Sequence, residues 1–168
     1  MKKLLFIFIL ILLSSNAFAS LKNKIKTSSA CYTLKTLGLQ AAKDWHYYGD
    51  YIGWGCNSNY KEIRKNAGQY YAAVNLSFYA EGLKNEVKKV YLSLNVNNKI
   101  DAKFGHEKLL ESSSILYSKI SGRSLTSDIV KAIINGKPFQ KKLNDLDIQV
   151  TRDDWPTGKG YGVSFIIN

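Results

Sequence analysis

Two stretches of the sequence decide the fold, QYYAAVNLSFYAE at Gln69–Glu81 and VKKVYLSLNV at Val87–Val96. In both, apolar residues alternate with polar residues or tyrosines. The apolar positions are Ala72, Val74, Leu76, Phe78, Ala80, Val90, Leu92, Leu94 and Val96. A period of two over such lengths predicts two strands with one buried and one open face each, and the short connection Gly82–Glu86 favours a hairpin between them.

Helical patterns elsewhere supply a layer that would cover the buried face. We expect a first helix over 28–37 and a long helix over 102–120, because apolar residues recur there at helical spacing. A further helix is expected to begin at an N-cap, Thr126, and to end at Asn135–Pro138. The glycines that would stop these helices are Gly38, Gly122 and Gly136.

Three shorter strands complete the predicted fold. One is expected over 53–58, one begins at Leu146, and the last alternates over 161–167. Strands joined by short loops pair antiparallel, and helices cover their apolar face. The sequence therefore predicts an α+β two-layer sandwich in the order α-β-β-β-α-α-β-β. Its mainly antiparallel sheet would have four to five strands, with two to three helices on one face.

Residues 1–19 have the organisation of a cleaved export signal. Lys2 and Lys3 precede an apolar run over 4–13, and the triplet 17–19 (Ala-Phe-Ala) predicts cleavage after Ala19. The apolar run is too short to span a bilayer, and no later segment is apolar enough to do so. We therefore expect a periplasmic or secreted protein that does not span the membrane. Residues 20–168 would form a single globular domain, with a basic, flexible arm over 20–27.

The chain is strongly basic, with 24 Lys and Arg residues against 13 Asp and Glu residues. Removal of Lys2 and Lys3 with the signal leaves 22 basic residues against 13 acidic ones, a net charge of +9. Such a protein suits an acidic protein partner or an anionic cell-envelope polymer. Nucleic-acid binding is not expected, because the chain is exported and shows no basic recognition helix.

The two cysteines, Cys31 and Cys56, are most simply a disulfide in an oxidising compartment. The alternative is a small hydrolase in which Cys56 acts as the nucleophile and His106 as its base. His106 lies on the apolar stripe of the long helix, which favours a histidine of the core or its boundary. The sequence therefore assigns no catalytic residue and no metal ligand, and no cofactor is expected.

Two aromatic segments that lie among glycines are the candidate binding residues. The first contributes Trp45, Tyr48, Tyr51 and Trp54, and the second contributes Asp154, Trp155 and Lys159. If both segments lie at the same end of the sheet, they would form one aromatic contact surface. The alternatives are that the first group packs around the disulfide and that Trp155 folds back onto the sheet.

These observations favour an exported, non-enzymatic binding protein that acts through protein–protein contact, for example an immunity or inhibitor protein of the periplasm. The alternative function is a binding module for cell-envelope glycan or anionic polymer, in which tyrosine and tryptophan rings stack on sugars. The Cys56 and His106 hydrolase is the remote alternative.

Overall fold

The computed structural model describes Leu21 and residues 24–168, so the predicted signal peptide at residues 1–19 lies outside the described residues. The helices are α1 (Thr27–Ala30), the 3-10 helix η2 (Lys35–Leu37), α2 (Ala102–Ser121) and α3 (Ser127–Asn135). The strands are β1 (His46–Tyr47), β2 (Trp54–Asn57), β3 (Lys61–Ile63), β4 (Val74–Leu83), β5 (Glu86–Val96), β6 (Phe139–Leu143), β7 (Leu146–Asp154) and β8 (Tyr161–Ile167).

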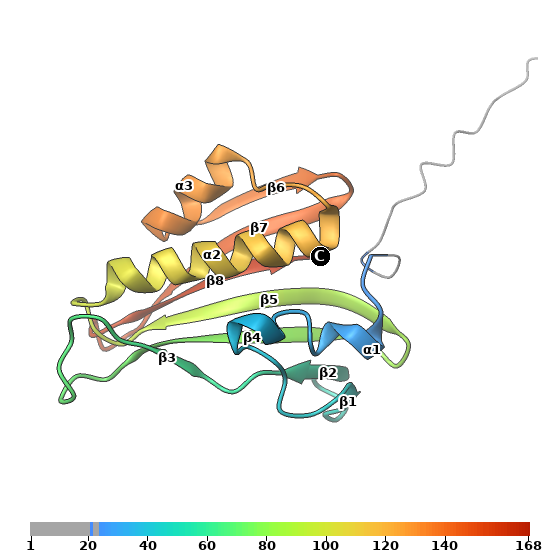
Figure 1. Cartoon of the computed structure of the whole chain (residues 1–168), viewed down its shortest axis with the longest axis horizontal. Coiled ribbons are helices and arrows are strands. Elements are labelled where there is room, and N and C mark those ends of the chain that lie inside the picture. Colours follow the sequence, from blue (N-terminus) through green and yellow to red (C-terminus); the bar gives the residue numbers. More distant parts are fainter. Residues whose placement is uncertain (1–20, 22–23) are drawn as a thin grey trace, which may run out of the picture.

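The strands form one antiparallel sheet of eight strands. Seven of them follow the order β1-β2-β4-β5-β8-β7-β6, and the eighth, β3, pairs with β4 outside this order. Strands β2 and β3 pair with successive parts of the same edge of β4. Figure 1 shows α2 and α3 lying against the same side of this sheet. The protein is thus α+β with a mainly antiparallel sheet, as predicted.

The face of the sheet beneath the helices is the hydrophobic core. The fully buried side chains that the strands contribute to it include Val74, Phe78, Val90, Leu92, Leu94, Ile148, Val163, Phe165 and Ile167. Helices α2 and α3 contribute Leu109, Leu116 and Ile133 to the same cluster. The alternation in β4 and β5 therefore reports the buried face correctly, because each apolar residue in register meets another one across the ladder, as Phe78 meets Leu92.

The predicted count of four to five strands was too low, because three strands carry no alternating pattern. Strands β1 and β3 are too short for a period to be visible. Strand β6 has the sequence FQKKL, in which Lys141 occupies a position on the helix side of the sheet. Lys141 Nζ lies 2.7 Å from the Asp128 carboxylate of α3, so the pattern is broken by a lysine whose charge is paired.

Strand β4 begins at Val74 rather than at Gln69 as predicted. The carbonyl groups of Ala72 and Ala73 accept hydrogen bonds from the side-chain amides of Asn98 and Asn97, so a sheet partner is not needed there. The preceding loop is held by Asp101, whose buried carboxylate accepts hydrogen bonds from the backbone N–H groups of residues 65–67. Side chains therefore replace the ladder that alternation alone would predict.

The helix expected over 28–37 is divided into α1 and η2. The carbonyl group of Cys31 accepts a hydrogen bond from the N–H of Ala41, so this carbonyl does not take part in the hydrogen bonds of a continuous helix. Gly38 ends η2 in the left-handed region with φ of 70°, and Gly122 and Gly136 end α2 and α3 in the same way, as predicted. Within the segment expected to be a flexible arm, Leu21 and Ile25 lie in the core.

Candidate functional site

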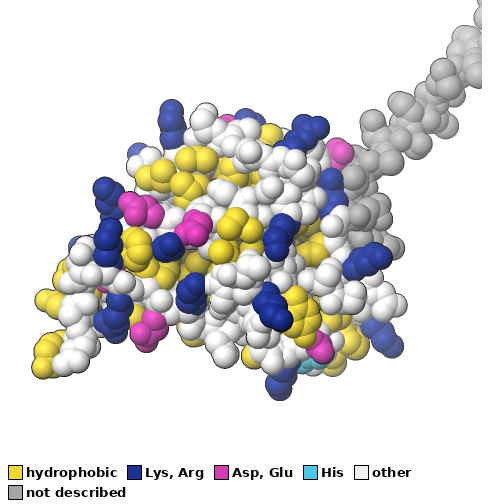
Figure 2. All heavy atoms as spheres, viewed as in Figure 1, with side chains coloured by type: hydrophobic (Ala, Val, Ile, Leu, Met, Phe, Trp, Pro, Cys, Tyr) yellow, Lys and Arg dark blue, Asp and Glu magenta, His cyan; other side chains and the backbone are white. Residues whose placement is uncertain are grey.

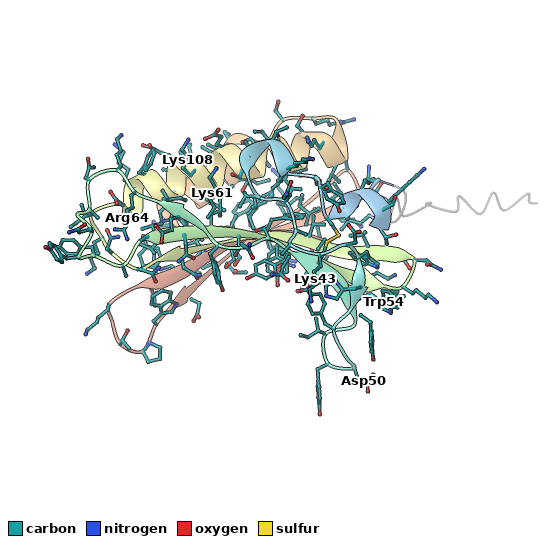
Figure 3. All side chains as sticks on the ribbon, turned by 60° about the horizontal axis from the view of Figure 1, so that its bottom comes forward. Lys43, Asp50, Trp54, Lys61, Arg64 and Lys108 are labelled. Carbon is teal, nitrogen blue, oxygen red and sulfur yellow. A yellow bond between two sulfur atoms is a disulfide. The ribbon has the colours of Figure 1, made fainter. Side chains whose placement is uncertain are left out.

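The candidate site is the hairpin at residues 46–54, which connects β1 to β2. Figure 3 shows it projecting from the sheet on the side opposite α2, with Asp50 near its tip. Its turn is closed by hydrogen bonds from Tyr48 N–H to the Gly53 carbonyl and from Gly53 N–H to the Gly49 carbonyl, each 2.8 Å long. Gly49 and Gly53 have φ values of 110° and 80°, which favour glycine, and the Tyr47 hydroxyl donates to the Asp50 carboxylate.

The tip of this hairpin presents large side chains to solvent. Tyr51 is fully exposed (106%) and Ile52 is 58% exposed, while Tyr47 and Tyr48 are exposed as well. Exposed apolar side chains on a loop that its own hydrogen bonds hold in place are typical of protein contact surfaces, because little conformational entropy is lost on binding.

At the base of the hairpin, Trp45 and Trp54 line a surface hollow together with Cys31 and with Thr27 and Ser28 of α1. The Tyr47 and Trp54 rings lie 5.9 Å apart there, and Lys84 Nζ lies 6.0 Å from the centre of the Trp54 ring. Trp45 packs partly against the core, and its indole N–H donates to the Leu83 carbonyl. Trp45 is therefore a supporting residue of this hairpin rather than a fully available contact.

One side of the hairpin meets the open face of the sheet, which is the face opposite α2. A pocket of about 210 Å³ lies in this angle. Its main lining side chains are Tyr48, Ile52, Asn57, Tyr79, Glu81 and Tyr91, and we call it the corner pocket. The Tyr79 and Tyr91 rings stack with centroids 4.6 Å apart, and the Tyr48 hydroxyl donates to Asn57 Oδ1 over 2.5 Å.

A charged group fixes the wall of the corner pocket. The Tyr91 hydroxyl donates to one oxygen of Glu81, and Lys89 Nζ lies 2.7 Å from the other. Burial and the hydrogen bond to Glu81 raise the pKa of Tyr91, so its hydroxyl stays protonated and continues to donate at physiological pH. The three side chains therefore form a fixed polar edge beside the tyrosine rings.

The second predicted segment, the loop between β7 and β8, lies at the opposite end of the sheet. Trp54 pairs with Gly82 near the β4–β5 turn, whereas Tyr161 pairs with Val96 at the far end of β5. The single aromatic surface expected from both segments is therefore not formed. The candidate residues of the loop between β7 and β8 make contacts within their own segment instead.

The three candidate residues at the β7–β8 loop differ in their surroundings. Trp155 is half-buried and folds back: a Cβ atom added at Gly160 would lie 2.5 Å from its ring. Asp154 lies 2.6 Å from the guanidinium group of Arg152, which holds the pKa of that carboxyl below its usual range. Lys159 is exposed.

The residues of the hydrolase hypothesis are engaged in structural contacts. Cys31 and Cys56 form a disulfide with Cα atoms 5.7 Å apart, so Cys56 has no thiol. His106 is buried, its Nδ1 lies 2.7 Å from the Ile133 carbonyl and its Nε2 lies 3.0 Å from the Tyr161 hydroxyl. In the described part of the chain, no three His, Cys, Asp or Glu residues are grouped as metal ligands would be.

Sequence reasoning missed the residues that complete the corner pocket. Tyr79 and Tyr91 occupy the open-face positions of the two alternating strands, and Glu81 follows at the same face. Two tyrosines at matched positions of a predicted hairpin were the available signal. What the sequence did not show is that the hairpin at 46–54 would stand beside them.

Comparison of the chain with protein-family models, with curated proteins and with solved structures found no match. No helix within the described residues has the length and apolar character needed to cross a membrane.

Proposed function

We propose that this is an exported, non-enzymatic binding protein that contacts another protein through the hairpin at 46–54. The observation that carries the proposal is the fully exposed Tyr51 beside the exposed Ile52, on a turn closed by its own hydrogen bonds. An immunity or inhibitor protein of the periplasm is the concrete form of this function. The Cys31–Cys56 disulfide supports export, since such bonds persist in oxidising compartments.

The charge around the hairpin indicates what kind of contact this is. The segments 43–54 and 81–89 contain four lysines and four acidic residues, so the net positive charge of the chain lies elsewhere. Figure 3 shows Lys43 near the base of the hairpin and Asp50 near its tip. We therefore propose that the partner is held by aromatic and apolar contact, and that charge complementarity contributes little at this surface.

The test is affinity capture from cell-envelope extract with three forms of the mature protein as bait. These are the wild type, the double variant Tyr51→Ala/Ile52→Ala, and Tyr70→Ala as a control that removes an equally exposed ring from another loop. A protein held by the wild type and by the control, but lost with the double variant, is the expected result. Loss of anchoring aromatic contacts of about 2 kcal/mol or more would weaken binding roughly thirtyfold.

Equal capture by all three forms would contradict the proposal, and unchanged circular dichroism spectra would show that the variants are folded.

The second candidate function is glycan binding in the corner pocket, favoured by the tyrosine rings and hydroxyl groups that line it. Two results together would favour that function instead. The wild-type protein would sediment with purified cell wall while Tyr79→Ala would not, and no protein partner would be captured.

A further inference from the structure

A second pocket lies far from the hairpin, on the helix side of the sheet between β3 and α2. It has a volume of about 150 Å³. Its cations are Lys61 and Arg64, from β3 and the residue after it, and Lys108 of α2; we call it the cationic pocket. Figure 3 shows these three side chains in the same part of the molecule, away from the hairpin. In Figure 2, Lys and Arg side chains are spread over the visible face, with fewer Asp and Glu side chains among them.

Helical and strand periodicity bring these groups together. Phe104, Lys108 and Ser112 recur at intervals of four in α2 and line one side of the pocket. Lys61 lies two residues before the buried Ile63 in β3 and thus faces the same side of the sheet. Leu37 and Phe104 are partly exposed beside these cations, so the surface of the pocket combines charged with apolar side chains, and the buried Leu39 lies beneath it.

Positive charge is concentrated around one aromatic ring. The ammonium group of Lys65 lies 4.9 Å from the centre of the Phe104 ring, and that of Lys108 lies 5.5 Å from it. The lining carboxylates, Glu62 and Glu111, pair with Arg64 and Lys108 at 3.6 Å and 2.7 Å. The side chains of these two acids are 71% and 48% exposed, and such surface pairs open readily.

The cations keep donor capacity for a ligand. Lys61 Nζ donates to the Leu37 carbonyl, yet an ammonium group has three N–H donors. Arg64 Nη1 donates to the carbonyl groups of Gly68 and Tyr71, which fixes the guanidinium plane and leaves the Nη2 donors. The nearby Asp101 carboxylate accepts hydrogen bonds from three backbone N–H groups and also attracts Arg64.

We propose that the cationic pocket binds a phosphate group carried on a small carbon skeleton. Three cations against two exposed carboxylates leave net positive charge, and an oriented Arg beside two Lys suits the several oxygens of a phosphate. The partly exposed side chains of Leu37 and Phe104 would contact the carbon skeleton, and the volume limits it to a few atoms. A soluble organic phosphate and a phospholipid headgroup share this chemistry.

The test is a titration of the mature protein with glycerol phosphate, followed by NMR of backbone amides in 61–65 and 104–112, with chloride keeping ionic strength constant. A parallel arm measures binding to vesicles that contain phosphatidylglycerol, against vesicles of phosphatidylcholine alone. We expect saturable binding that Lys61→Gln/Lys108→Gln weakens at least tenfold. Lys131→Gln/Lys137→Gln, which removes the same charge from exposed positions on and after α3, should change it less than twofold.

The two arms identify the source of the phosphate. Saturation by glycerol phosphate indicates a soluble ligand, and binding to the anionic vesicles alone, lost in the same double variant, indicates a lipid headgroup. The proposal is overturned if neither arm shows saturable binding, or if both double variants lose it equally, because that would be unspecific attraction. Retained spectra and retained partner capture through the hairpin would show that the pocket variants are folded, so the two proposals fail independently.

Discussion

The sheet has one face under the helices and one open face, and a pair of substitutions in β8 tests this directly. Phe165 is fully buried between Leu92 of β5 and Val150 of β7. Ile166, the next residue, is on the opposite face and only partly buried. We expect Phe165→Ala to lower the free energy of unfolding by about 3–5 kcal/mol, because it removes a whole aromatic ring from the core and leaves a cavity.

The same substitution at Ile166 removes an aliphatic side chain that helices do not cover. Its cost should be about 1 kcal/mol, typical of a partly exposed position. For a domain of this size each kcal/mol corresponds to roughly 2–4 °C in Tm, so Phe165→Ala should melt about 6–20 °C lower than wild type. The free energies are measured by urea unfolding followed by circular dichroism, with thermal melts as a second observable.

An equal loss at both positions would refute the reasoning, because it would mean that the open face is covered as completely as the other. A loss below 1 kcal/mol for Phe165→Ala would also refute it, because the removal of a ring from the centre of the core costs more than that. An unchanged urea dependence is the control that both variants unfold from the same native state.

Three further predictions concern single features. Non-reducing mass spectrometry should show the Cys31–Cys56 bond as a deficit of two hydrogen atoms, and replacing both cysteines by Ser should cost about 3.5 kcal/mol; labelling of free thiols in untreated protein would contradict this. Hydrogen bonds from the N–H groups of residues 65–67 lower the pKa of Asp101, so its stabilisation is present at neutral pH and lost as the pH falls through that lowered value. The difference in urea stability between wild type and Asp101→Asn should therefore be largest near pH 7 and shrink below pH 3.8, whereas a constant difference would count against it. Ser77 has a buried hydroxyl without a hydrogen-bond partner, so Ser77→Ala should leave urea stability unchanged or higher, and a clear loss would reveal a partner for that hydroxyl.

Part of the candidate site was visible in the sequence. Tyr48, Tyr51 and Trp54 were predicted as binding residues from rings set among glycines, and they lie on the projecting hairpin. Trp155 was predicted from the same kind of pattern, yet its ring lies against Gly160. Composition identifies a segment that leaves the regular elements, but it does not report whether a ring then turns outward or back onto the sheet.

The sequence by itself determined the elements whose signal is local. The alternation of β4 and β5, the apolar stripe of α2 and the left-handed glycines at helix ends depend on neighbours within a few residues, so a local pattern was enough to predict them. The pairing of Cys31 with Cys56, which the structure contains, was predicted from the presence of two cysteines together with the expected export signal.

The tertiary structure alone decided which segments meet. β8 lies between β5 and β7, and this places the 154–161 loop at the end of β5 opposite the hairpin. The corner pocket joins Tyr48 to Tyr79 and Tyr91, and the cationic pocket joins Lys61 to Lys108. Such contacts depend on strand order and register between distant segments. These are set by how the whole apolar surface is buried at once, and no short stretch of sequence encodes them.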